Sequence, residues 1–191
     1  MNAPMMPAMT AAGLRRLQRS RRVTRQFGAQ PIAQTFLELI VHAGRSASSG
    51  GNNRIHRFLV LRDRELIRLV RAMSPGMLGY PTALVVVCTD LHAAALRQIN
   101  ADVYRTRWID VGTAMANMML MVEALGLGSC PLTSFSQGGV SVVLDLPEHA
   151  VPEAILQMGH RPGGRAVDEP SPEHTRTLDP YIYWDRYGSE R

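Results

Sequence analysis

The chain has 191 residues and a formal net charge of +5, and 46% of its residues are hydrophobic. This length favours one compact domain with its own core, and this hydrophobic fraction excludes an intrinsically disordered chain. No apolar stretch reaches the roughly 18 residues that a membrane span requires. We therefore expect a soluble, cytoplasmic protein with no membrane partner. The chain contains no lysine, and six of its arginines fall between Arg15 and Arg25.

The first half of the chain predicts helices that alternate with a strand and small polar loops. Pro31 suits the first position of a helix because proline lacks the N–H that would be left unbonded there. The loop SASSGGNN combines hydroxyls, glycines and carboxamides. The expected elements are a loose tail over 1–12, a helix over 13–20, a helix from Pro31 to about Ala43, the loop over 46–53, a strand over 58–61, a helix over 64–73 and a turn-rich loop over 74–81.

The second half carries the two strongest patterns. The continuous apolar run Ala83–Cys88 predicts a strand that is buried on both faces. Residues 108–125 form a helix that is apolar nearly all round, which places it deep in a core or at an oligomer interface. The remaining expectations are a strand that begins within 126–135, a short helix over 137–144, a strand over 154–158 and a C-terminal arm over 164–191. We expect the arm, with its aromatic residues between Tyr181 and Tyr187, to dock on a partner subunit as part of a single domain over 13–191.

Both cysteines are expected to be buried, reduced thiols, since Cys88 and Cys130 lie in apolar stretches. Neither belongs to a CxxC pair, and no spacing typical of a metal site occurs, so we expect no metal. The chain also contains no Walker-type phosphate loop, HExxH motif or GxSxG elbow. These absences leave metalloprotease and serine hydrolase chemistry without the residues that they need.

Four segments could contact a ligand. In RRVTRQF, Arg21, Val23 and Arg25 share one face if the segment is extended, so two guanidinium groups could clamp a phosphate; a solvated charge run is the alternative. The loop over 47–53 suits contact with a polar, planar ligand, but it also suits any ordinary loop. Backbone amides in GLGSCPLTSF could point at a ligand. A fourth segment, ILQMGHRP, ends a buried strand, and Arg176 follows downstream.

In this order, the four segments resemble the nitroreductase superfamily. RRVTRQF is similar to its arginine-rich flavin motif, SASSGGNNRIHRF to its loop before the first strand, DVGTAMANMMLMVEALGLGSCPLTSF to its central helix and following strand, and ILQMGHRP to its last core strand. The likeness covers residues 14–188. It implies an α+β fold, a three-layer α/β/α sandwich with a mixed, mostly antiparallel sheet. It also implies a homodimer that binds FMN at the subunit interface, with the C-terminal arm extending over the partner subunit.

The resemblance implies which residues contact FMN. The N-terminal arginines and Arg176 would meet the phosphate, the ribityl chain and the pyrimidine edge, and the small polar loop would come from the other subunit. A backbone N–H of Thr133 or Ser134 would face flavin N5. The full set is Arg21, Arg22, Val23, Arg25, Ser48, Ser49, Asn52, Pro131, Leu132, Thr133, Ser134 and Arg176.

The chain departs from the family pattern at several positions. Val23 replaces a common serine, Ser48 replaces the usual proline, and residues 54–56 (Arg-Ile-His) replace a Gln-Pro-Trp run. The short SPGMLG segment implies a different cover over the active site and a different substrate. His56 and Tyr104 could reach the substrate cavity, although ordinary packing is the alternative for each.

The implied function is that of an FMN-dependent oxidoreductase, which transfers hydride through flavin N5 in a ping-pong cycle. NADPH or NADH would donate, and a nitroaromatic or quinone would accept. RAMSPGMLGYPTALVVVCTD also resembles the catalytic subunit of the albonoursin-type cyclic dipeptide oxidase, a desaturase that uses oxygen as acceptor. Alternatives of another class are a non-catalytic flavin-binding protein and a nucleic-acid binder. Only Phe27 lies near the arginine cluster as a stacking aromatic, which argues against nucleic acid as a partner.

Overall fold

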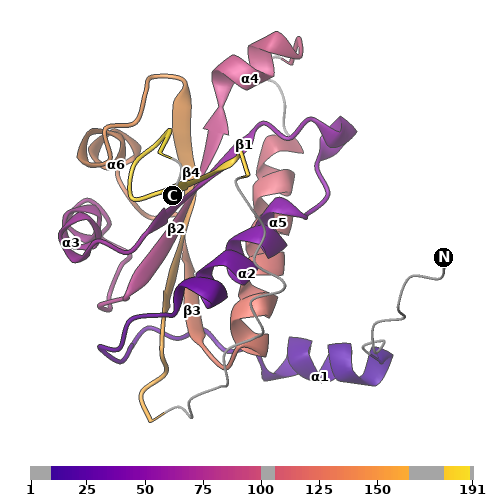
Figure 1. The fold of residues 1–191 in the computed structure, drawn as a ribbon, viewed down its shortest axis with the longest axis vertical. Coiled ribbons are helices and arrows are strands. Elements are labelled where there is room, and N and C mark those ends of the chain that lie inside the picture. Colours follow the sequence, from indigo (N-terminus) through magenta and orange to yellow (C-terminus); the bar gives the residue numbers. More distant parts are fainter. Residues whose placement is uncertain (1–9, 100–105, 164–178, 190–191) are drawn as a thin grey trace.

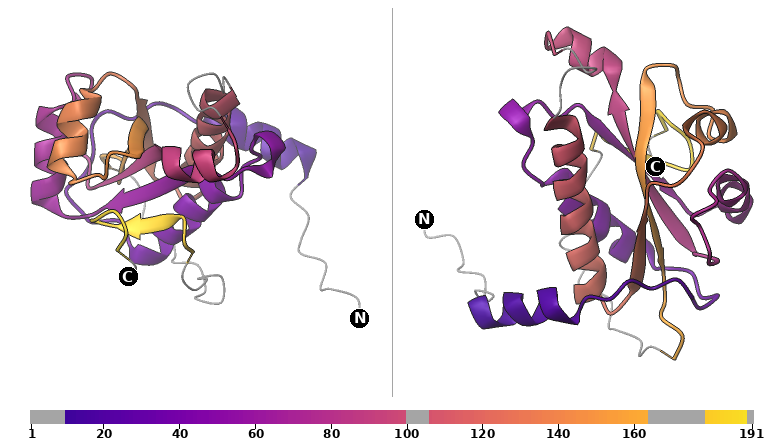
Figure 2. Two further views of the ribbon diagram at one scale, coloured as in Figure 1. Left: turned by 90° about the horizontal axis from the view of Figure 1, so that it is seen from above. Right: turned by 180° about the vertical axis from the view of Figure 1, so that it is seen from behind.

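A five-stranded sheet lies between two layers of helices (Figure 1). The structure is a computed structural model that describes residues 10–99, 106–163 and 179–189. Helices α2 (Gln34–Arg45) and α5 (Thr106–Ala124) cover one face of the sheet, and α3 (Arg64–Ala72) and α6 (Gln137–Val143) cover the other face (Figure 2). This arrangement confirms the predicted three-layer α/β/α sandwich.

The sheet is mixed and mostly antiparallel, as predicted. Its strand order is β3-β4-β2-β1-β5, and the β1–β5 pairing is its one parallel pairing among named strands of the described residues. The strands are β1 (His56–Leu61), β2 (Ala83–Asp90), β3 (Gly128–Leu132), β4 (Ala150–Gly159) and β5 (Ile182–Trp184).

The apolar run in β2 serves two cores at once. Successive side chains of a strand point to opposite faces, so Val85 and Val87 pack in the core beneath α2 and α5, whereas Leu84 and Val86 pack in the core beneath α3 and α6. Every residue of β2 is buried. Two separate cores therefore explain why this strand is continuously apolar rather than alternating.

Several element boundaries differ from the sequence-based predictions, and three of these differences have a local structural cause. Helix α1 (Ala11–Ser20) begins two residues early because the Thr10 side chain accepts a hydrogen bond from the N–H of Gly13 and caps the helix. Helix α2 begins at Gln34 rather than Pro31, because Ala33 is still extended. Strand β4 begins at Ala150 rather than Ala154, and a register shift opposite Pro152 accommodates the proline that obscured the strand in the sequence.

Three described elements were not predicted, and one of them is the short 3-10 helix η1 (Gly50–Asn52) within the small polar loop. Helix α4 (Leu91–Leu96) follows directly from β2, and the Asp90 side chain caps it by accepting the N–H of Ala93. Strand β5 belongs to the C-terminal arm and pairs with β1. Within the described part of the chain, no helix is long and apolar enough to cross a membrane.

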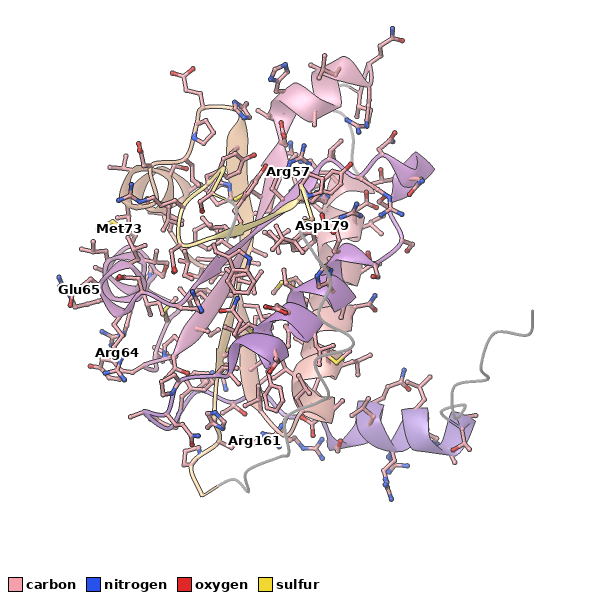
Figure 3. All side chains as sticks on the ribbon, viewed as in Figure 1. Arg57, Arg64, Glu65, Met73, Arg161 and Asp179 are labelled. Atoms are coloured by element: carbon pink, nitrogen blue, oxygen red, sulfur yellow. The ribbon has the colours of Figure 1, made fainter. Side chains whose placement is uncertain are left out.

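The end of the C-terminal arm docks on the chain's own sheet. Asp179 pairs with Arg45 at 3.3 Å, and the ring of Tyr181 lies beneath the guanidinium groups of Arg45 and Arg57, at 3.9 and 4.8 Å from the ring centroid. Figure 3 shows Arg57 and Asp179 near one another at this edge. The expected contact of the arm with a partner subunit stays a prediction, since the structure contains one chain.

Candidate active site

The arginine-rich segment runs along the edge strand β3 of the sheet and forms an isolated bridge with it. Thr24 donates its N–H to the carbonyl of Ser129 in β3 at 2.8 Å, and Val23 forms a parallel bridge with Ser129. Further along, Gly28 donates its N–H to the carbonyl of His160 at 2.8 Å. The segment over 21–28 is thus anchored at two points to the strands of the sheet.

The loop between α3 and β2 joins this segment to the end of β3. Gly76 donates its N–H to the carbonyl of Ser134 at 3.2 Å, and Ser136 donates its N–H to the carbonyl of Met73 at 2.8 Å. Gly79 packs directly against the Arg25 carbonyl. Three segments, 21–28, 73–80 and 131–136, therefore meet in what we call the three-loop site.

Close contact at Gly79 gives the first testable prediction. A Cβ atom at this position would lie 2.0 Å from the Arg25 carbonyl oxygen, which is backbone and cannot move without shifting the arginine segment. We expect Gly79→Ala to lower the free energy of unfolding by about 1 kcal/mol or more, as overpacking does. Urea unfolding followed by circular dichroism measures the change.

The matched control for this prediction is Gly138→Ala. Gly138 lies within α6, and a Cβ there meets nothing within 4 Å. This substitution should leave stability unchanged or raise it by roughly 0.5–1 kcal/mol, because alanine is a better helix former. Equal stability of Gly79→Ala and the wild-type protein would show that the arginine segment does not depend on this contact.

The three N-terminal arginines that were predicted to contact flavin, Arg21, Arg22 and Arg25, differ in the contacts that their side chains make. Arg22 is bound to backbone, because its Nη1 donates to the carbonyls of Arg19 and Arg21 at 2.6 and 3.0 Å. Arg21 reaches α5, where its Nη1 lies 3.8 Å from the sulfur of Met119. None of these three arginines pairs with a carboxylate in the described residues. Arg21 and Arg25 therefore keep their charge available for an anionic ligand.

The end of β3 offers backbone donors to the same site. Pro131, Thr133 and Ser134 are exposed, whereas Leu132 is buried in the core beneath α3 and α6. Across residues 10–99, 106–163 and 179–189, no acceptor receives the N–H of Thr133 or Ser134. Two adjacent amide donors at exposed residues thus have no described acceptor, which suits an electron-rich, planar ligand.

The small polar loop lies at the opposite end of α5. Both carboxylate oxygens of Asp110 accept the N–H of Gly50, at 3.0 and 3.1 Å, and the hydroxyl of Thr113 donates to the Ser48 carbonyl at 3.2 Å. Asp110 and Met119 are nine residues apart, which is roughly 13 Å along a helix. Within one chain, Ser48, Ser49 and Asn52 therefore do not join the arginines, and the predicted contribution of this loop to a partner's site stays a prediction.

Asp110 and Thr113 are positioning residues that the sequence reading missed. The sequence feature that could have identified Asp110 is a carboxylate in an otherwise apolar helix. Asp110 is only 6% exposed, and its burial raises the pKa of its carboxyl group, while the hydrogen bond from Gly50 acts in the opposite direction. A buried acceptor of this kind fixes the backbone of the loop over 48–52.

His56 is buried beneath that loop. Neither of its ring nitrogens has a hydrogen-bond partner among the described residues, and it borders a small cavity of about 30 Å³ with Ser48, Ser49 and Asp110. Burial, followed by the charges of Arg57 and Arg107, lowers the pKa of His56 to about 4. The imidazole is therefore neutral near pH 7.

Tyr104 and Arg176, the other candidates placed by sequence alone, lie outside the described residues.

Both cysteines are buried and unpaired, as predicted. Burial raises the pKa of the Cys88 thiol, and it also raises that of Cys130, although the nearby charge of Arg25 acts in the opposite direction. Neither thiol has the lowered pKa of a nucleophile. A search of the residues that the structure describes finds no group of three or more histidine, cysteine or acidic side chains placed to hold a metal ion.

Comparisons with known proteins agree with this geometry. The sequence model of the nitroreductase family matches residues 19–78 and 69–160. The chain is 26% identical to an NADH dehydrogenase of Thermus thermophilus, over 95% of this chain and 97% of the relative, and 23% identical to an FMN reductase (NAD(P)H) of Bacillus subtilis, over 78% and 66%. A solved nitroreductase family protein from Clostridium novyi superposes with a TM-score of 0.74 at 17% identity, covering 92% of this chain and 95% of that one, which shows a shared fold.

Proposed function

Because the chain belongs to the nitroreductase family, we propose that it is an FMN-dependent oxidoreductase that takes electrons from NAD(P)H and passes them to a small acceptor. One observation carries the proposal: the segment with Arg21 and Arg25, neither of which pairs with a described carboxylate, and the segment with the unbonded N–H groups of Thr133 and Ser134 both belong to the three-loop site. The similarity to an FMN reductase supports the choice of flavin.

The residues present fit the demands of FMN. A phosphate needs cationic partners, and Arg21 and Arg25 have no described carboxylate to compete with it. The arginine segment is held closely against β3, because a Cβ at Gly128 would lie 2.6 Å from the Thr24 side chain. The exposed Thr133 and Ser134 amides would donate to the edge of the ring that carries N5.

When bound, FMN supplies the hydride-transfer chemistry itself. The chain's own residues bind the cofactor, orient it and stabilise negative charge. Arg21 and Arg25 would hold the phosphate or the pyrimidine edge, and positive charge there favours a reduced, anionic ring. The neutral His56 is buried beneath the loop over 48–52, so we assign it no proton-transfer role at neutral pH.

The proposed active unit is a homodimer in the cytoplasm. Ile109, Gly112 and Ala116 share one face of α5 and are exposed, with Ile109 at 63%. An apolar face with small residues lets a second helix approach closely. A partner seated there would bring its own Ser48, Ser49 and Asn52 loop toward this chain's arginines, which completes the FMN contacts implied by the family resemblance.

The experiment is an absorbance titration of the purified protein with FMN, followed by anaerobic NADPH. We expect the absorbance bands of the bound flavin to be bleached by NADPH and restored by a quinone. A protein that takes up no FMN would overturn the proposal. Bands bleached by a cyclic dipeptide alone, and restored by air, would instead support the desaturase that the sequence also resembles.

A further inference from the structure

A groove on the outer side of α3 carries more positive charge than its surroundings neutralise. It has a volume of about 330 Å³ and lies between α3 and residues 80–82, with Ala29 at one edge. Three arginines of α3 line it, Arg64, Arg68 and Arg71, against a single carboxylate, that of Glu65. Figure 3 shows Glu65 projecting from α3 on the side away from the sheet and Arg64 projecting below the helix.

Two of these arginines are held in place without being neutralised. Arg64 donates to the carbonyl of Ala29 at 3.2 Å, and Arg71 donates through Nε to the carbonyl of Gly79 at 3.1 Å. Neither pairs with a carboxylate in the described part of the chain, whereas Arg68 pairs with Glu65 at 2.9 Å. A guanidinium group held through one nitrogen still presents others to a phosphate oxygen.

The groove also has an aromatic wall. The ring of Tyr80 is 73% exposed, and the guanidinium of Arg71 stacks over it at 4.2 Å from the ring centroid. Pro81 and Ile67 add apolar surface to the lining. An exposed ring beside two available cations suits a ligand that combines a planar heterocycle with phosphate groups.

The position of the groove connects it to the three-loop site. Tyr80 and Pro81 follow Gly79, which packs against the Arg25 carbonyl, while Gly76 of the same loop is bonded to Ser134. One loop therefore forms a wall of the groove and a side of the three-loop site. An extended molecule with one end in each place would cross a single loop.

We propose that this groove binds the phosphorylated adenosine end of NADPH, with Arg64 and Arg71 on its phosphates and Tyr80 against the adenine. The inference rests on the proposed function for the identity of the donor. It goes further by assigning a site to the half of the donor that does not react, and it commits to NADPH over NADH, because two available guanidinium groups favour the extra 2′-phosphate.

The test measures binding of adenosine 2′,5′-bisphosphate by isothermal titration calorimetry, with the FMN spectrum as a separate readout. We expect this probe, which has no nicotinamide ring, to bind at least 10-fold more tightly than AMP, and Arg64→Ala and Arg71→Ala each to weaken it by 10-fold or more. Both variants should keep the wild-type FMN spectrum and kcat while KM for NADPH rises. Arg97→Ala, an exposed arginine of the α4 end, is the charge-matched control.

Equal affinity of the wild-type protein and both groove variants for the bisphosphate would overturn the proposal, as would equal affinity for the bisphosphate and AMP. Weak binding that inorganic phosphate displaces fully, with no preference for the nucleoside, would also overturn it. A wild-type protein that binds the bisphosphate through Arg64 and Arg71 but takes up no FMN would support the nucleotide site in the groove and contradict the assignment of FMN as cofactor. The proposal for the groove and the proposal for the flavin site can therefore be contradicted independently of one another.

Discussion

Replacing Arg21 and Arg25 together by alanine is expected to weaken FMN binding by at least about 100-fold, since each charge-assisted hydrogen bond contributes roughly 1.5–3 kcal/mol. The segment that carries both residues is fixed by Thr24 and Gly28 through their backbone N–H groups, so the side chains can be removed without releasing it. Titration of the apoprotein with FMN, followed by quenching of flavin fluorescence, gives the two dissociation constants.

Two control variants separate this effect from loss of charge in general. Arg22→Ala removes an arginine whose guanidinium donates to the carbonyls of Arg19 and Arg21, so we expect a smaller loss of FMN affinity, below about 10-fold. Arg97→Ala removes the same charge from the end of α4 and should leave the affinity unchanged. If the double variant binds FMN as tightly as Arg97→Ala, the three-loop site is not the flavin phosphate site.

Patterns that depend on one element alone were predicted well from the sequence. The apolar run of β2 and the long helix α5 were placed within two residues at each end, because a sequence that is apolar nearly all round leaves a signal that needs no partner to interpret. Strand β5 has three residues and pairs with β1, which lies more than 120 positions earlier in the chain. No local pattern marks so short a strand, and its stability comes from that distant pairing.

In the candidate site, too, features with a local sequence pattern were predicted, and contacts between distant segments were not. The sequence identified the arginine segment and the backbone amides after β3 as candidates for ligand contact, because arginines and a strand end are visible in the local pattern. The contact between Gly79 and the Arg25 carbonyl was not predicted, because it joins backbone atoms 54 residues apart that no side-chain pattern records. The role of Asp110 was also missed, since its acceptor function appears only when the loop at Gly50 is folded against α5.

Acid should destabilise this protein more than its His56→Gln variant. Above the unfolded-state pKa of 6.5, His56 is neutral in both states and contributes no pH dependence. Below it, the unfolded chain binds a proton that the folded chain excludes until its own pKa of about 4, because the imidazole is 7% exposed and faces Arg57 and Arg107. Stability is therefore lost as the pH falls from 6.5 to 4.

The size of this effect makes it measurable. At pH 5 the lowered pKa corresponds to about 2 kcal/mol of lost stability relative to pH 7.5, and glutamine, which does not titrate, lacks that loss. Urea unfolding at both pH values should show a steeper decrease for the wild-type protein than for His56→Gln. His92→Gln, at an exposed position of α4, should keep the wild-type decrease. Parallel decreases for all three proteins would mean that His56 is protonated in the folded state, and the loop above it would then have to accommodate a charge.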